Sequence, residues 1–312
     1  MITVRELSKR FGATVAVDRI SFEVGRGEVL GFLGPNGAGK TTTLRMLSGY
    51  LPPTGGTAEL GGRDVVEAGL EVRRRIGYLP ENNPLYEEMD VCEYLEWTAE
   101  IRGFSGQART NRIRSAVEAC GLGEVLGRPI GLLSKGYRQR AGLAAAILHD
   151  PDILLLDEPT SGLDPNQARE VRDLILKLKE AKTVVLSTHI LPEVQASCDR
   201  VVIIHRGRIA ASGTPKELKR AASGLGLIHL SLKASDVDLA SARETLETVP
   251  GVERSDASEE DGELRFSLTC RPEAGDLRET FFRIAVEKSW TLLHLNREEA
   301  SLEHVFRELT LK

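Results

Sequence analysis

The pattern of apolar and polar positions predicts strands that alternate with helices over most of the chain. Near the N-terminus, ITVREL and AVDRISFEV alternate apolar and polar residues, which is typical of half-buried antiparallel strands. Three later segments are almost uniformly apolar, as strands covered on both faces are: EVLGFLG (28–34), ILLLDE and TVVLSTH. Helical patterns lie between these segments, mainly over 87–149. The order predicts an α/β fold with a largely parallel, covered sheet.

The pattern changes after about residue 220. A strand (LIHLSLK), a helix, two strands around the turn EEDG, a helix and the strand TLLHLNR follow one another, and SLEHVFRELT reads as a last helix. The order βαββαβ is typical of a ferredoxin-like α+β domain. We therefore expect two domains, residues 1–220 and 221–312.

The composition of the chain excludes several classes of protein. The 312 residues are 41% hydrophobic, and the four cysteines form no CxxC pair, which argues against a disulfide framework or a zinc site and favours a reducing, cytosolic setting. No apolar run is long enough to cross a membrane, and the N-terminus does not resemble a signal peptide. Residues 221–312 hold 11 Lys and Arg against 18 Asp and Glu, which argues weakly against a nucleic-acid platform there.

A glycine-rich turn follows the first buried strand. The segment GPNGAGKT (34–41) fits G-x-x-x-x-G-K-[ST] and lies between a predicted strand and a predicted helix. Backbone amides of such a turn, together with a helix N-terminus, hold polyphosphate, and a lysine at the helix start faces the β- and γ-phosphates. The alternative is a glycine-rich turn that holds a lysine by chance and binds no phosphate. The candidate nucleotide-binding residues are Gly34, Pro35, Asn36, Gly37, Ala38, Gly39, Lys40, Thr41 and Thr42.

Acidic residues end the second buried strand. Asp157 stands where enzymes with such a loop hold Mg²⁺, together with the Thr41 hydroxyl, and Glu158 can act as general base toward an attacking water. A surface pair that caps the next helix is the alternative. His189 ends the following strand, which should lie beside the first, so its imidazole should approach Glu158 and the γ-phosphate.

Two further positions have an open interpretation. Glu81 ends the strand in GYLPE and could complete the Mg²⁺ shell, or it could be an ordinary turn carboxylate. Phe11, between the N-terminal strands, could stack on an adenine ring, or it could pack in the core. Arg73–Arg75 read as a solvated helix face next to the strand expected in RRRIGYLPE.

The segment LLSKGYRQR (132–140) has no place in a nucleotide site built by one copy of the chain. Ser134 offers a hydroxyl, Gly136 exposes an amide, and the helix that follows presents its positive end. Lys135 adds a charge that could attract phosphate or face solvent. We infer a head-to-tail dimer in which this helix start covers the γ-phosphate held by the other copy.

Six motifs in order, GPNGAGKT, GYLPE, LLSKGYRQR, ILLLDEP, SGLD and STH, closely resemble the nucleotide-binding subunit of ABC transporters. The resemblance covers residues 1–220 and implies a P-loop fold with an antiparallel β subdomain and a helical subdomain at about 82–145. It implies that Asp164 of SGLD lies at the dimer seam. Within the family, the chain resembles ATPases with ABC-2-type membrane partners, and among those the gliding-motility-associated ones. Glu81, Lys135 and Tyr137 depart from the common motifs.

The resemblance implies an ATPase that uses ATP and Mg²⁺, pairs with a second ATPase subunit, and drives an integral-membrane permease. Such a subunit is cytoplasmic and peripheral on the inner face of the cell membrane, and no nucleic acid is expected as a partner. A soluble ABC ATPase acting on DNA or ribosomes is the alternative, although the chain has neither a long coiled-coil insertion nor a second cassette. A plain P-loop kinase or GTPase would leave LLSKGYRQR unexplained.

Overall fold

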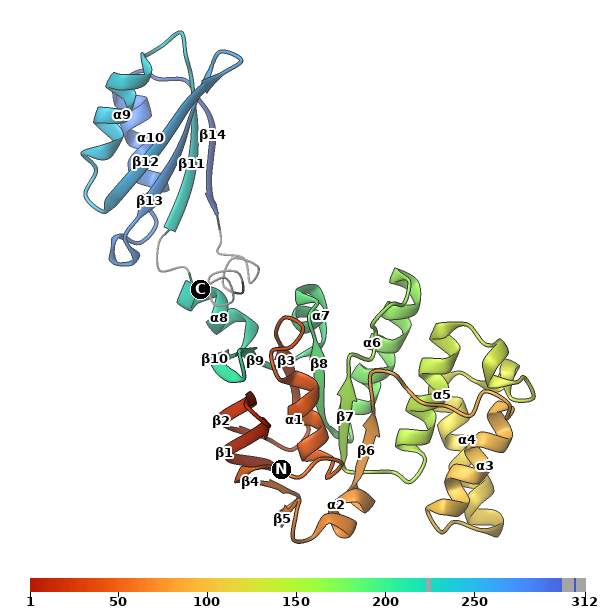
Figure 1. Ribbon diagram of the computed structural model, residues 1–312. Helices are drawn as coiled ribbons and strands as arrows, with labels where there is room; N and C mark the ends of the chain where they lie inside the picture. Colours follow the sequence, from red (N-terminus) through yellow and green to blue (C-terminus); the bar gives the residue numbers. More distant parts are fainter. Residues whose placement is uncertain (223–225, 299–305, 307–312) are drawn as a thin grey trace. The chain divides into compact units, whose positions relative to one another are not determined.

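The computed structural model describes residues 1–222, 226–298 and 306 (Figure 1). The chain divides into two compact units, of which the first runs from Met1 to Pro215 and the second begins at Lys216. Each unit has its own hydrophobic core.

A six-stranded sheet forms the centre of the first unit. Its strands, in spatial order, are β10 (Arg208–Gly213), β9 (Arg200–His205), β3 (Val29–Leu33), β8 (Thr183–Thr188), β7 (Ile153–Asp157) and β6 (Ile76–Leu79). All neighbours pair in parallel except β9 and β10, which form an antiparallel hairpin. The largely parallel sheet expected from the apolar strands is thereby confirmed.

Both faces of this sheet are covered, which explains why its strands lack polar alternation. Along β7, Leu154 and Leu156 enter one core, whereas Ile153 and Leu155 enter the other. The first core includes the helices α3 (Val91–Ile101), α4 (Gly106–Cys120), α5 (Lys135–Ile147) and α6 (Pro165–Lys179). The second includes α1 (Lys40–Leu47) and a separate antiparallel sheet. Alternate side chains on one strand therefore hold the two layers together.

The antiparallel sheet has the order β2-β1-β4-β5. The strands β1 (Ile2–Phe11) and β2 (Thr14–Val24) match the alternating segments of the sequence, but β4 (Gly55–Leu60) and β5 (Arg63–Asp64) were not anticipated. The expected strand in RRRIGYLPE is shorter than predicted: the three arginines end the helix α2 (Gly69–Arg75), and the strand starts at Ile76. The remaining helix of this unit is α7 (Leu191–Ser197).

In the second unit, two helices cover one four-stranded antiparallel sheet. The elements are α8 (Pro215–Ala222), which starts at the division, β11 (Gly226–Lys233), α9 (Leu239–Glu247), β12 (Val252–Glu260), β13 (Glu263–Cys270), α10 (Arg278–Glu287) and β14 (Leu292–Glu298). The expected βαββαβ order is present, with the spatial order β12-β13-β11-β14. The last helix expected in SLEHVFRELT falls almost wholly outside the described residues. None of the described helices is both long and apolar enough to span a bilayer.

Candidate functional site

The glycine-rich turn joins β3 to α1 at the carboxyl edge of the central sheet. Gly39 has φ 109°, a conformation that favours glycine, and a Cβ on Gly34 would collide with the Ile204 carbonyl. The Lys40 ammonium folds back over the turn and donates to the carbonyls of Gly34 (2.7 Å) and Pro35 (3.2 Å). The loop is thus closed on itself around the lysine.

A hollow of about 320 Å³ opens over this turn. It is lined by Ala16 of β2, residues 36–42, Glu81 and Glu158. The structure therefore brings the predicted loop together with both predicted glutamates. Exposed backbone and the N-terminus of α1 give this hollow a preference for anions.

Asp157 lies at the end of β7 and is fully buried. Its Oδ1 accepts hydrogen bonds from the hydroxyls of Thr41 (3.0 Å) and Ser187 (2.6 Å), whereas its buried Oδ2 has no partner in the described residues. Burial raises the pKa of this carboxyl, against the lowering by the two hydroxyls. An orphaned carboxylate oxygen beside a threonine hydroxyl is a hard-oxygen donor set that fits Mg²⁺.

Glu158 contacts two other predicted residues at once. Its Oε1 lies 3.2 Å from Lys40 Nζ, and its Oε2 lies 2.8 Å from His189 Nδ1. Its φ of 48° is left-handed, and its amide donates to the Ser187 hydroxyl (3.0 Å), which helps to hold this conformation. Strands β7 and β8 are adjacent, as the position of His189 required.

Sequence reasoning missed the residues that support this centre. Ser187, the last residue but one of β8, bonds to both acidic positions. Tyr78 of β6 lies close to Asp157, and burial, followed by the Asp157 charge, raises the Tyr78 pKa to about 12. The Tyr78 hydroxyl therefore stays neutral at ordinary pH.

The residues 134–136 do not line this hollow. Ser134 caps α5 by accepting from the Tyr137 amide (3.4 Å), and Gly136 is buried against the Gln167 side chain. The Lys135 ammonium lies over Gly162, where a Cβ would collide with it. Farther along α5, Arg140 forms an ion pair with Glu170 of α6.

Asp164, the acid of SGLD, caps the start of α6. Its Oδ1 accepts from the amides of Asn166 (3.0 Å) and Gln167 (2.9 Å). The segment 132–140 and SGLD therefore form one packed assembly between α5 and α6, which we call the α5–α6 block: residues 134–140 and 162–170.

Phe11 and Glu81 each had two interpretations from the sequence. Glu81 is exposed and lines the hollow. Phe11 ends β1, is 50% exposed, and does not line the hollow, although Ala16 of the neighbouring strand does. The interpretation of Phe11 as a core residue is thus wrong.

Comparisons with known proteins agree with this site. A family model described as "ABC transporter" matches residues 17–161. Nod factor export ATP-binding protein I of Burkholderia lata is 36% identical over 311 residues, covering 99% of this chain and 96% of the relative. The ABC transporter ATP-binding protein NatA of Bacillus subtilis is 40% identical over 224 residues, covering 70% and 91%. The chain belongs to the family of ABC transporter ATP-binding proteins.

Other similar proteins extend this result. The probable multidrug ABC transporter ATP-binding protein YbhF of Escherichia coli is 41% identical over 220 residues, and the chain spans only 38% of its length. A solved structure titled "Structure of ATP binding subunit of ABC transporter" is 31% identical, with a TM-score of 0.65 over 72% of this chain and 93% of that one. The dimeric cassette MJ0796, at 24% identity and a TM-score of 0.64, shares the fold.

Proposed function

We propose that the chain binds and hydrolyses ATP to power a membrane transporter. The observation that carries this proposal is the double contact of Glu158, which lies against both Lys40 and His189 at the edge of the phosphate-binding turn. A carboxylate in that place can accept the proton of a water that attacks the γ-phosphate. The histidine orients this carboxylate and can donate to the phosphate.

Residues 34–42 hold the triphosphate, and Phe11 stacks on the base. Thr41 and Asp157 would hold Mg²⁺ with Glu81 at its rim, because Thr41 and Asp157 already share a hydrogen bond and Asp157 Oδ2 finds no partner in the part of the chain that the structure describes. When bound, the ion neutralises charge on the phosphate oxygens. Lys40 then exchanges its loop carbonyls for phosphate.

A second copy of the chain completes the site. Ser134, Lys135 and Gly136 carry an anion-binding helix start, but they lie outside the hollow of their own copy. In a head-to-tail homodimer they close over the γ-phosphate bound by the other copy, and Asp164 reaches the seam. ATP then stabilises the closed pair, and hydrolysis releases it.

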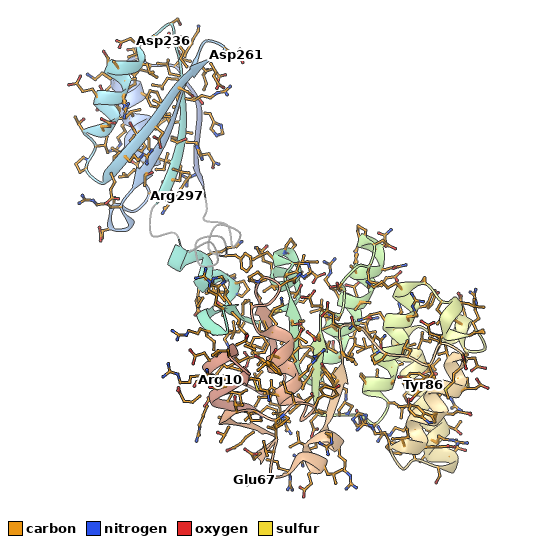
Figure 2. All side chains as sticks on the ribbon, viewed as in Figure 1. Arg10, Glu67, Tyr86, Asp236, Asp261 and Arg297 are labelled. Atoms are coloured by element: carbon orange, nitrogen blue, oxygen red, sulfur yellow. The ribbon has the colours of Figure 1, made fainter. Side chains whose placement is uncertain are left out.

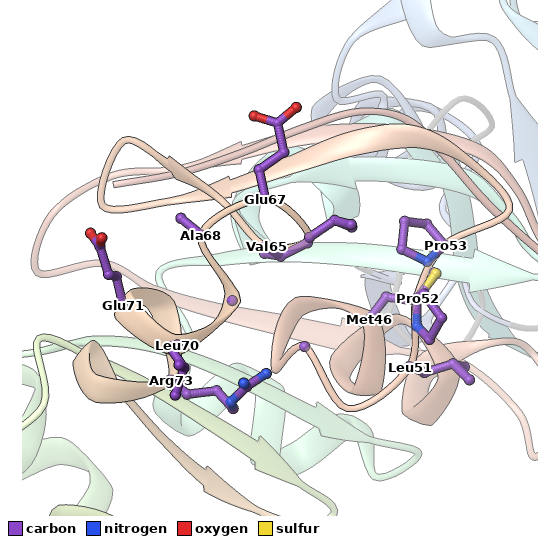
Figure 3. Close-up of a pocket in the computed structure, with 13 residues that line it drawn as sticks. Met46, Leu51, Pro52, Pro53, Val65, Glu67, Ala68, Leu70, Glu71 and Arg73 are labelled. Carbon is purple, nitrogen blue, oxygen red and sulfur yellow. The ribbon is translucent and has the colours of Figure 1, made fainter.

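The permease partner has a surface to bind in this unit. A hollow of about 460 Å³ lies between the end of α1 and the segment leading into α2, as Figure 3 shows. Val66 and Leu70 are exposed at this hollow. The Arg102 guanidinium at the end of α3 donates to the Arg73 carbonyl (2.9 Å) and ties α2 to the helical insert. A hollow with exposed apolar side chains and charged ones (Glu67, Glu71 and Arg73) beside them could receive a helix of an integral-membrane protein.

A second exposed group in this unit is aromatic. Tyr86 and Trp97 are exposed and pack edge to face, with ring centroids 4.8 Å apart. Tyr86 lies on the helical side of the unit, away from Arg10 of β1 (Figure 2). When the ATP-bound pair closes, the helical subdomain would move. A permease helix docked near the Glu81 loop would move with it.

The transporter is, in this proposal, an ABC-2-type exporter, and the gliding-motility-associated ATPases are its expected subgroup. Two of the relatives are named for export or for multidrug transport. The subunit would be cytoplasmic, peripheral on the inner face of the membrane through the permease. The domains proposed from sequence, 1–220 and 221–312, place an accessory α+β domain after the ATPase. The alternative of action on DNA or ribosomes is not favoured by these relatives.

The test is Glu158→Gln in the full-length chain. We expect steady-state ATP hydrolysis to fall at least about 100-fold, because the general base is lost, and Mg-ATP to trap a dimer visible by light scattering. Glu59→Gln, on the exposed face of β4, serves as the control and should behave as wild type. Wild-type turnover by the Glu158 variant, or a strictly monomeric variant in Mg-ATP, would contradict the proposal.

A further inference from the structure

Lys9 is a lysine in a place where lysines are rare. It lies on β1, two residues before Phe11, and only 8% of its surface is exposed. Lysines that deeply buried are normally paired with a carboxylate. The ion pairs of the described residues include none to Lys9, so its ammonium is held by other groups.

Two groups surround this ammonium. The Pro52 carbonyl accepts a hydrogen bond from Nζ at 2.6 Å, and the Phe11 ring centroid lies 5.3 Å from Nζ. The cation therefore lies against the ring at a distance typical of a cation–π contact. Half of Phe11 remains exposed, so the ring also has surface open to solvent.

We infer that Lys9 is a positioning residue for nucleotide binding: its ammonium fixes and polarises the Phe11 ring as a platform for the base. This inference rests on the proposed function, in which Phe11 stacks on the nucleotide base. It adds a residue that does not touch the nucleotide and acts through the ring.

The Lys9 charge acts on the base through the electrons of the Phe11 ring. An ammonium against one side of an aromatic ring attracts the π electrons toward itself and leaves the other side less negative. A purine base presents an electron-rich face, so offset stacking on the polarised ring meets less repulsion. The hydrogen bond to Pro52 keeps the ammonium in place, so the ring is held in one orientation before nucleotide arrives.

A purely structural role would consist of the bond to Pro52 alone. Lys9 would then fasten the end of β1 to the loop at 51–54, and its loss would loosen the strand without any preference for the base. The two roles differ in what they do to ligands with and without a base, and this difference can be measured.

The experiment uses the full-length chain without Mg²⁺, so that no turnover occurs, and isothermal titration with two probes. ATP carries a base, and inorganic tripolyphosphate carries only the phosphates. Lys9→Met keeps the length and packing of the side chain but removes its charge, whereas Lys9→Arg keeps the charge. We expect Lys9→Met to weaken ATP binding about 2- to 5-fold and to leave tripolyphosphate binding unchanged. Lys9→Arg should retain most of the ATP affinity.

Phe11→Ala supplies the second arm. It should weaken ATP binding about 5-fold or more without changing tripolyphosphate binding, and in its background Lys9→Met should have no further effect on ATP. Equal weakening of both probes by Lys9→Met, or an undiminished effect in the Phe11→Ala background, would overturn the inference and leave the strand-fastening role. If Phe11→Ala binds ATP as tightly as wild type, the base does not stack on Phe11 and the inference fails. The ATPase proposal is tested separately, by ATP hydrolysis and dimer formation in Glu158→Gln.

Discussion

A buried carboxylate without a partner for one oxygen is the clearest conflict between stability and function in this chain. Asp157 is enclosed at the end of β7, where burial raises its pKa, and its Oδ2 has no hydrogen-bond partner among the described residues. The folded state thus binds the proton of this group more tightly than the unfolded state does. Above the ordinary value of 3.8, the ionised carboxylate therefore destabilises the metal-free fold, and this penalty disappears as the pH falls toward 3.8.

Asp157→Asn should therefore stabilise the protein that has no nucleotide or metal. The amide oxygen can still accept from Thr41 and Ser187, and the charge is gone. We expect calorimetry at pH 7 to show a midpoint of unfolding about 2–4 °C higher, with ATP hydrolysis lost, and the gain should shrink as the pH is lowered. Asp152→Asn, at an exposed position, should shift neither quantity. A lower midpoint for Asp157→Asn at pH 7 would contradict this account.

The residues of the site were predictable from sequence where a motif gives both the residue type and its position at the end of a strand. Lys40, Asp157, Glu158 and His189 could be placed in one site because strands of a parallel sheet end at a common edge. Ser187 and Tyr78 could not be chosen from the sequence, because serine and tyrosine at strand positions are common. Their roles depend on which strands are neighbours, and β6 and β8 flank β7 only in the folded sheet.

At the level of elements, the hairpin β9–β10 supports the phosphate-binding turn from behind. The Gly207 amide in its tip donates to the Ala38 carbonyl (2.9 Å), and the Gly207 carbonyl accepts from the Asp18 amide of β2 (2.8 Å). One residue of the hairpin thus ties the turn to the antiparallel sheet. A Cβ on Gly207 would lie 2.9 Å from the Ala16 carbonyl, and Ala16 lines the hollow.

Gly207→Ala should therefore impair nucleotide binding more than stability alone explains. Gly62→Ala is a matched control, because Gly62 has φ 75° against 77° for Gly207 but open space around its Cβ. Both variants carry similar backbone strain. At a temperature where both variants are folded, we expect the KM for ATP to rise about tenfold more in Gly207→Ala than in Gly62→Ala, and the midpoint of unfolding of Gly207→Ala should also fall further, because its Cβ meets backbone. Equal KM values in the two variants would show that the contact does not position the turn.

Elements with strong patterns were predictable from sequence, and those with weak patterns were not. The buried strands were identified because uniformly apolar runs need cover on both faces. β4 was missed because GGTAEL begins with two glycines and carries little apolar periodicity, and it forms by pairing with β1. The reading of Arg73–Arg75 as an exposed helix face is confirmed, whereas the strand expected in RRRIGYLPE was started too early, because a short helix before β6 leaves no separate signal in a charged run.

At the level of the whole molecule, two units with separate cores should unfold in two steps. The nucleotide residues all belong to the first unit, whereas the second has its own core around Leu230, Phe266 and Phe281. A ligand stabilises only what it binds, by about 2.7 kcal/mol when its concentration is 100 times Kd. Calorimetry of the full chain with ADP should therefore move one transition upward by several degrees and leave the other in place. A single transition that moves as a whole would contradict this independence.

The α5–α6 block determines what a second copy can offer. Lys135 lies over Gly162, Gly136 packs against Gln167, and Arg140 pairs with Glu170. The Ser134 hydroxyl, which would cover the triphosphate bound by the other copy, and the Asp164 carboxylate, which would contact that copy, thus belong to one packed assembly. If the proposed dimer forms, these two groups should engage the opposite copy together, so closure over the nucleotide should follow occupancy in a single step.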